Sequence, residues 1–297
     1  MFNKEFNLKK HINKIIRLIL LTFFWALLLM ITYTIISGQS LSVGVILKSI
    51  LNLDMKWGMN LFWYLGALIC IYILFPALKY LFDSNRKAFV FFVVACFILT
   101  FGVVFGSQML SLVGVAVHHP LESFLYHPML SMFNPFRGSY GYSFVYFCLG
   151  GIVFKYEDRI RSIPKSKRVI ISVIGILISC GGLFFYGICY SNLVAKQVWD
   201  VVWGGYDTIF TLANVIFIYV LSLEYKSNNS FIISISCNTL GIYFIHGLVI
   251  RLTRPWIESI DFLCNLPFNI LYGFIILCIC LGICLIMKKI PLIRKLI

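Results

Sequence analysis

The chain has 297 residues, of which 61% are hydrophobic and only 12% are charged. Soluble domains contain about half apolar and a quarter charged residues, so this composition excludes a water-soluble globular fold. The net charge of +14 would suggest nucleic acid as a partner of a soluble protein. Here the basic residues lie between apolar runs, where they set membrane topology, and no nucleic-acid partner is expected.

Apolar runs near 20 residues recur along the chain, the length that a helix needs to cross a hydrocarbon core of about 30 Å. The first run follows a basic stretch, but it is too long for a signal peptide and no convincing cleavage site follows it. We predict an all-α, polytopic transmembrane bundle with about eight spans: 16–37, 60–80, 88–105, 140–154, 169–190, 206–223, 234–250 and 266–287. Residues 41–53 are too short to span, and residues 231–236 are predicted to form a short lead-in helix.

The distribution of basic residues predicts the orientation of these spans. Of the 25 Lys and Arg residues, 19 fall at the two termini and in alternate loops, and six fall in the opposite loops. Because cytoplasmic loops carry the excess of positive charge, both termini are predicted to be cytoplasmic. No internal repeat or soluble segment is found, so residues 1–297 are predicted to form a single membrane domain.

The longest predicted extramembrane piece is the outer segment 106–139. It contains His118, His119 and Arg137 among prolines and aromatic residues. The histidines lack an HExxH spacing and have few acidic neighbours, so no metal is expected. An exposed, proline-rich loop explains them, and the alternative is an outward-facing acceptor site in which Arg137 binds an acidic or hydroxylated group.

His246 lies within the seventh predicted span, where an ionisable side chain needs a partner or a polar cavity. One interpretation is an imidazole bonded to a neighbouring backbone carbonyl, which holds two helices together. The other is a substrate-binding or catalytic imidazole, suited to proton transfer near neutral pH. Tyr243 lies three residues earlier on the same helical face, so the two side chains could line one cavity.

Lys14 and Arg17 lie three residues apart around the start of the first span, on one face of a helix at the cytoplasmic surface. They can be a topological anchor that contacts lipid headgroups. They can also form a phosphate or pyrophosphate site for a cytoplasmic donor, to which Arg17 contributes bidentate geometry and Lys10 and His11 could contribute further.

Two features of the middle spans have a structural interpretation and an alternative. Asp207 can be an intramembrane carboxylate, but a helix N-terminal charge favoured by the helix dipole is preferred. Gly150 and Gly151 are expected to allow close helix packing, because no strand or complete GxGxxG motif supports a dinucleotide loop.

Four stretches in order resemble the acyltransferase 3 family of bacterial membrane acyltransferases. KKHINKIIRLILLTFFWALL resembles the family's basic pair before an aromatic-rich helix, with Lys14 where arginine is usual. NLFWYLGALICIYILFPAL resembles its Trp-centred helix, here Trp63 to Pro76, and YSFVYFCLGGIVFKY its aromatic, glycine-rich helix. SCNTLGIYFIHGLVI, which contains His246, resembles its most specific signature.

The resemblance covers nearly the whole chain, with two departures from the family pattern. Family members usually have ten helices, the first carrying an arginine and, eleven positions later, the histidine regarded as catalytic. None of the five histidines here has that arginine, so the chain is expected to begin at the equivalent of the third helix. Leu61 also stands where many relatives have histidine.

The resemblance implies a multi-pass protein of the bacterial inner membrane that acts in O-acetylation of cell-envelope polysaccharide. An acyl-CoA, such as acetyl-CoA, would dock on Lys14 and Arg17, and His246 with Tyr243 would promote transfer to a hydroxyl of a glycan or lipid-linked glycan. Trp63, His118, His119 and Arg137 are the expected acceptor-binding residues, and membrane lipids are the other expected partners. The alternatives are a non-catalytic accessory protein, or a transporter of glycan or lipid.

Overall fold

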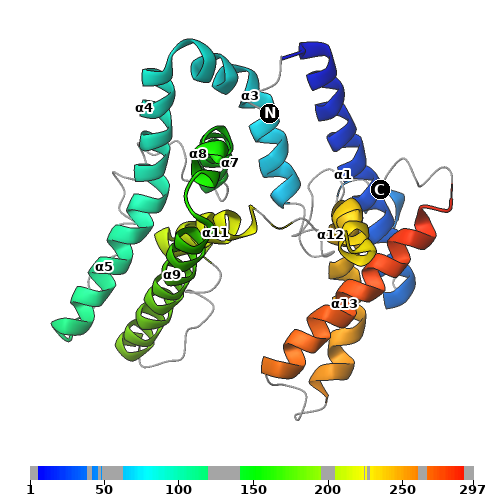
Figure 1. Ribbon diagram of the computed structural model, residues 1–297. Helices are drawn as coiled ribbons and strands as arrows, with labels where there is room; N and C mark the ends of the chain where they lie inside the picture. Colours follow the sequence, from blue (N-terminus) through cyan, green and yellow to red (C-terminus); the bar gives the residue numbers. More distant parts are fainter. Residues whose placement is uncertain are drawn as a thin grey trace. The chain divides into compact units, whose positions relative to one another are not determined.

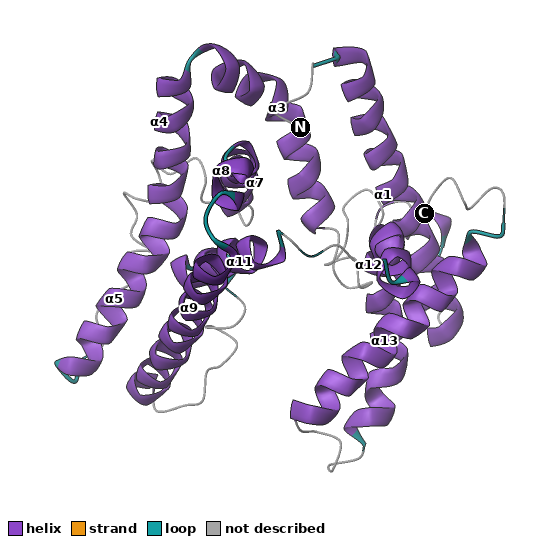
Figure 2. Cartoon of the chain, viewed as in Figure 1, coloured by secondary structure: helices purple, strands orange, loops and turns teal. Residues whose placement is uncertain are grey.

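The computed structural model describes residues 6–38, 42–45, 48, 63–119, 141–194, 205–223, 225, 228–259 and 266–290. Throughout these ranges the regular structure is helical, with no strand (Figure 2). Each of the eight predicted spans coincides with a helix in this part of the chain. The predicted all-α, polytopic fold is therefore confirmed.

Six of these helices are long and apolar enough to cross a membrane. They contain the stretches Leu8–Thr32, Tyr64–Ser84, Arg86–Ala116, Lys165–Asn192, Ser230–Ile257 and Pro267–Met287. The fourth and sixth predicted spans are shorter apolar helices, Gly141–Lys155 and Ile209–Ser222.

The chain divides into two compact units. The first consists of Met1–Leu8 and Cys70–Tyr225, and the second of Lys9–Ile69 and Lys226–Ile297. The single-domain organisation of residues 1–297 remains a prediction.

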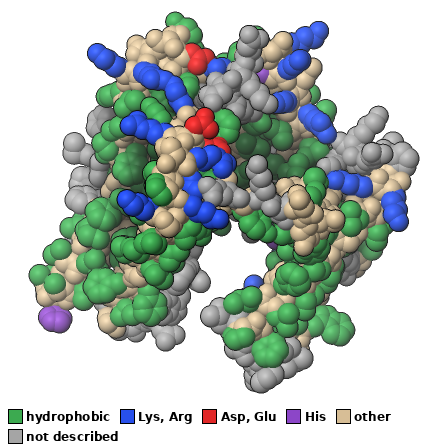
Figure 3. All heavy atoms as spheres, viewed as in Figure 1, with side chains coloured by type: hydrophobic (Ala, Val, Ile, Leu, Met, Phe, Trp, Pro, Cys, Tyr) green, Lys and Arg blue, Asp and Glu red, His purple; other side chains and the backbone are tan. Residues whose placement is uncertain are grey.

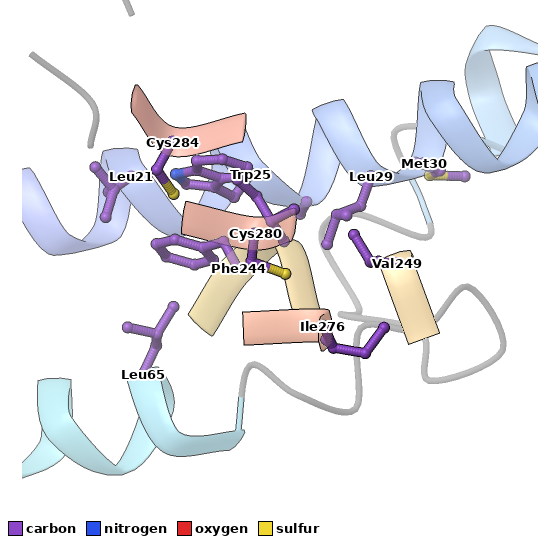
Figure 4. Close-up of a cluster of buried hydrophobic side chains, with 12 residues drawn as sticks. Leu21, Trp25, Leu29, Met30, Leu65, Phe244, Val249, Ile276, Cys280 and Cys284 are labelled. Atoms are coloured by element: carbon purple, nitrogen blue, oxygen red, sulfur yellow. The ribbon is translucent and has the colours of Figure 1, made fainter. Parts of the chain in front are cut away.

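The second unit is built from α1 (Leu8–Ser37), the start of α3 (Trp63–Ser84), α12 (Ser230–Glu258) and α13 (Leu266–Met287). Its core joins apolar side chains from all four helices (Figure 4). At the centre the ring of Trp25 stacks on that of Phe244, with centroids 4.7 Å apart and planes at 7°. Figure 4 shows Val249 beside Leu29, about one turn further along both helices, so α1 and α12 run in the same direction.

In the first unit, the second half of α3 is followed by helices whose buried side chains form shared clusters (Figure 1). A buried cluster of α3, α4 and α7 residues includes Phe75, Phe89 and Cys148. A second cluster joins α4, α7 and α11 around Phe101 and Leu212. The helices of this unit are α4 (Arg86–Phe97), η3 (Ile98–Gly102), α5 (Val103–Ala116), α7 (Gly141–Lys155), α8 (Glu157–Arg161), α9 (Lys165–Val194) and α11 (Ile209–Ser222).

Two predicted boundaries are wrong because the helices continue. The predicted outer segment begins at residue 106, but α5 extends to Ala116. The sequence there is still apolar, so nothing ends the helix at the hydrocarbon boundary. The predicted lead-in helix 231–236 is not separate either, since it forms the first turns of the continuous helix α12.

A π-helical stretch, η3, lies between α4 and α5. Within it the hydroxyl of Thr100 donates a hydrogen bond to the carbonyl of Cys96 at 2.6 Å. Side-chain bonds of this kind compete with the backbone ladder and distort helices locally. The stretch turns Phe101 fully into the core, where it packs edge-on against Tyr146.

Basic side chains gather at one end of each unit (Figure 3). In the first unit they cover the α3–α4 turn, α8 and the start of α9, whereas hydrophobic side chains cover α5. In the second unit they cover the start of α1 and the end of α13. These are the ends that the charge count predicts to be cytoplasmic.

Close packing at glycine occurs on α9, whereas Gly150, one of the two glycines expected to allow it, lies in open space. A Cβ added at Gly150 would meet nothing within 4 Å, so this glycine does not mediate close packing. A Cβ added at Gly182 would overlap the ring of Phe210, and one at Gly175 would overlap the ring of Phe217. The antiparallel pair α9 and α11 therefore depends on two glycines one heptad apart.

We expect Gly182→Ala to destabilise the protein relative to Gly181→Ala. Both changes add the same methyl group to α9 and gain up to about 1 kcal/mol of helix propensity. At Gly181 the added Cβ meets open space, whereas at Gly182 it meets Phe210, and overpacking costs about 1–3 kcal/mol. Thermal unfolding midpoints of the two variants in the same detergent test this difference. Equal midpoints would contradict the assigned contact between α9 and α11.

Candidate functional site

His246 and Tyr243 are neighbours on one face of α12, as predicted. Their rings lie 5.7 Å apart at 43°, and both side chains are half-buried. The ring of Tyr243 also contacts that of Tyr64 in the first turn of α3, with centroids 5.5 Å apart. The imidazole therefore sits beside an aromatic wall made by two helices of the second unit.

The hydrogen bond of His246 defines its chemistry. Its Nδ1 atom lies 2.6 Å from the carbonyl oxygen of Tyr243, one turn earlier on the same helix. A carbonyl oxygen can only accept, so Nδ1 carries the proton and Nε2 of the neutral ring keeps its lone pair. The structural interpretation expected this bond to join two helices. The bond stays within α12, so that expectation is wrong.

The opposite face of α12 fixes this helix against α1. Phe244 is buried and stacks on Trp25, whereas His246 two residues later lies on the other side of the helix. Helix α12 therefore packs against α1 through one face and carries the imidazole of His246 on the opposite face.

Lys14 and Arg17 lie within α1, on one helical face, and both are exposed. At a rise of 1.5 Å per residue, Arg17 is about 12 Å along the helix axis from Trp25. His246 lies about 3 Å beyond Phe244 in the same direction. Arg17 and His246 are thus about 15 Å apart along the parallel axes of α1 and α12.

His11 is a polar residue whose environment the sequence interpretation missed. It is only 6% exposed, whereas the sequence allowed it, with Lys10, a contribution to a phosphate site on the surface. Its position is readable from helical periodicity, because Leu18, Trp25 and Leu29 follow it at intervals of seven, seven and four residues on the buried face of α1.

His118 and His119 end α5 in the first unit, where both are exposed. The backbone N–H of His119 donates to the carbonyl of Gly114, and that of His118 to Val115. His118 has φ of 53°, in the left-handed region. This is a Schellman motif, in which histidine takes the position usually held by glycine.

Two predicted acceptor-binding side chains lie outside the described part of the structure. Trp63 is the first residue of α3, but its side chain is not described, and Arg137 falls in the segment 120–140. Among the described residues, no group of three or more His, Cys, Asp or Glu side chains is arranged to hold a metal.

A comparison with known families agrees with this architecture. A family model described as an acyltransferase domain matches residues 1–289, a range that contains all the helices above. No curated protein and no solved structure matches the chain at a significant level. The match confirms the resemblance found in the sequence, and the chain is therefore a multi-pass membrane protein of the acyltransferase 3 family.

Proposed function

We propose that the chain transfers an acyl group, such as acetyl, from cytoplasmic acyl-CoA to a hydroxyl of a cell-envelope polysaccharide or lipid-linked glycan. In this proposal it acts in the inner membrane of a bacterium. Lys14 and Arg17 bind the donor, and His246 is the general base. The observation that carries the proposal is the bond from Nδ1 of His246 to the Tyr243 carbonyl, which directs the basic Nε2 atom away from the helix backbone.

The arrangement of the second unit supports a long donor. Trp25 and Phe244 hold α1 and α12 in one register, so a phosphate bound at Arg17 lies about 15 Å from the imidazole along the helix axes. In acyl-CoA the phosphates and the thioester are separated by the extended pantetheine arm. His246 lies about 24 Å along a helix about 43 Å long, near its middle.

The proposed reaction uses one imidazole as base and then as acid. Nε2 of His246 takes the proton of the acceptor hydroxyl as its oxygen attacks the thioester carbonyl carbon. A C–O bond forms, the C–S bond breaks, and the proton passes from Nε2 to the departing CoA sulfur. Tyr243 packs against the imidazole and limits its rotation.

Further residues are proposed to contact the acceptor. Trp63 begins α3 next to Tyr64, whose ring contacts Tyr243, and we assign it to the acceptor path. His118 and His119 are exposed at the predicted outer end of α5, and Arg137 follows them along the chain. These assignments follow from residue type and position in the sequence.

The paired substitutions Lys14→Gln and Arg17→Gln are expected to weaken CoA binding on the order of tenfold or more, because charge-assisted bonds to phosphate contribute about 1.5–3 kcal/mol. Titration calorimetry of CoA into the full chain in nanodiscs measures this loss. Arg86→Gln with Lys87→Gln removes the same charge from exposed positions of the first unit and serves as the control. If both double variants bind CoA with equal affinity, Lys14 and Arg17 are a topological anchor and not a donor site.

Substitution of His246 separates its chemical role from its structural one. His246→Asn keeps a donor close to the Tyr243 carbonyl but has no basic nitrogen at the Nε2 position. We expect it to lower acyl transfer at least about 100-fold, the usual contribution of a general base, with unchanged CoA binding. Transfer is measured with labelled acetyl-CoA and the envelope fraction of the source bacterium.

Three outcomes would contradict parts of this proposal. Full transfer by His246→Asn would limit this histidine to a structural role. Absence of transfer by the wild-type protein would favour an accessory protein. Reduced glycan export with normal acylation in cells carrying the Lys14 and Arg17 substitutions would favour a transporter.

A further inference from the structure

Three tyrosines meet at the predicted outer ends of α7 and α11 in the first unit. The ring of Tyr142 stacks on that of Tyr206, with centroids 6.1 Å apart and planes at 23°. Tyr146, one turn along α7, packs edge-on against Tyr142 and donates a hydrogen bond from its hydroxyl to the Tyr206 carbonyl at 2.8 Å. The two helices are thus joined at this end by an aromatic cluster.

The backbone that carries Tyr206 is held in place by the N-terminal cap of α11. The buried side chain of Thr208 accepts from the N–H of Thr211 at 3.0 Å. The hydroxyl of Thr211 donates to the Gly205 carbonyl, also at 3.0 Å. Tyr206 itself remains 56% exposed, so a rigid segment presents its ring to the surroundings.

Asp207 adds a carboxylate to this cluster. It is half-buried beside Tyr146, and no described side chain of opposite charge pairs with it. Its carboxylate accepts a hydrogen bond from its own backbone N–H. The position at the start of α11 fits the predicted helix N-terminal charge, but a dipole contributes only about 0.3–1 kcal/mol, which is small against the cost of burying an unpaired charge. Among the described residues the fold therefore supplies a backbone hydrogen bond and a helix dipole for this carboxylate, but no counter-charge.

Helix α5 adds unpartnered polar atoms to the predicted outer half of the unit. Gln108 and Ser107 are each 5% exposed, and their side-chain oxygens have no hydrogen-bond partner among the described residues. Gln108 lies two turns beyond Phe101, on the same face of the helix, and Phe101 packs against Tyr146. Buried polar atoms of this kind normally bind water or a polar ligand.

We propose that Tyr142, Tyr206 and Asp207 bind a sugar ring of the acceptor glycan. The C–H face of a pyranose packs on the electron-rich face of an aromatic ring, and its hydroxyls donate charge-assisted hydrogen bonds to a carboxylate. Interfacial tyrosines alone are typical of any membrane protein, but a half-buried carboxylate beside them without a described counter-charge is not. This inference rests on the proposed function, which identifies the acceptor as a glycan. The new element is the site at which the glycan binds.

The test is a binding measurement that needs no acyl transfer. Saturation-transfer NMR and titration of chitotetraose, maltotetraose, cellotetraose and mannotetraose are carried out on the full chain in nanodiscs. We expect at least one of them to bind, and Tyr206→Ala and Asp207→Asn each to weaken that binding about tenfold. Tyr206→Phe keeps the ring and should bind as wild type does. Tyr80→Ala removes another exposed tyrosine of this unit and should also leave binding unchanged.

The outcomes distinguish this inference from the proposed function. Binding of none of the four sugars by the wild-type protein, or wild-type affinity in both Tyr206→Ala and Asp207→Asn, would overturn the sugar site. His246→Asn should bind the sugar normally, because its defect lies in transfer. A protein that binds sugar through Tyr206 and Asp207 but never transfers an acyl group would contradict the catalytic proposal alone.

Discussion

The stacked pair of Trp25 and Phe244 is the contact on which the candidate site depends. Inside a bilayer, helices gain little from hiding apolar surface, because lipid chains are as apolar as leucine. Close packing of specific side chains must therefore decide how two helices align. This stack fixes α1 and α12 in parallel register, and a shift of one turn would move the cations of α1 about 5.4 Å relative to His246.

The helical architecture could be predicted because a helix that crosses the hydrocarbon core must be apolar along most of its length. In the described part of the chain, runs of apolar residues located the six long apolar helices and the two short ones. The ends of the helices could not be predicted in the same way. α1 begins at Leu8, eight residues before the predicted span, because a helix continues into the polar interface without any hydrophobic signal.

The candidate site was predictable where its residues are close in sequence. The spacing of three residues was enough to place Tyr243 beside His246. The bond from the His246 imidazole to the Tyr243 carbonyl was not predictable, because the sequence does not show whether a side chain bonds to its own helix or to a neighbouring one. Gly150 and Gly182 show the same limit, since sequence marks both as small but does not tell which one faces an aromatic ring. Tyr142 and Tyr206 are too distant in sequence for any local pattern to pair them.

The two short helices have a consequence for the surrounding lipid. α7 and α11, with 15 and 14 residues, are about 22 and 21 Å long, against a hydrocarbon core of about 30 Å. They are neighbours and line a shared apolar cavity of about 110 Å³. Such a mismatch is accommodated when the bilayer thins locally, at a cost of a fraction of a kcal/mol per Å. We therefore expect the two leaflets to approach each other next to this pair, so that water on either face lies closer to the middle of the protein there than elsewhere in the membrane.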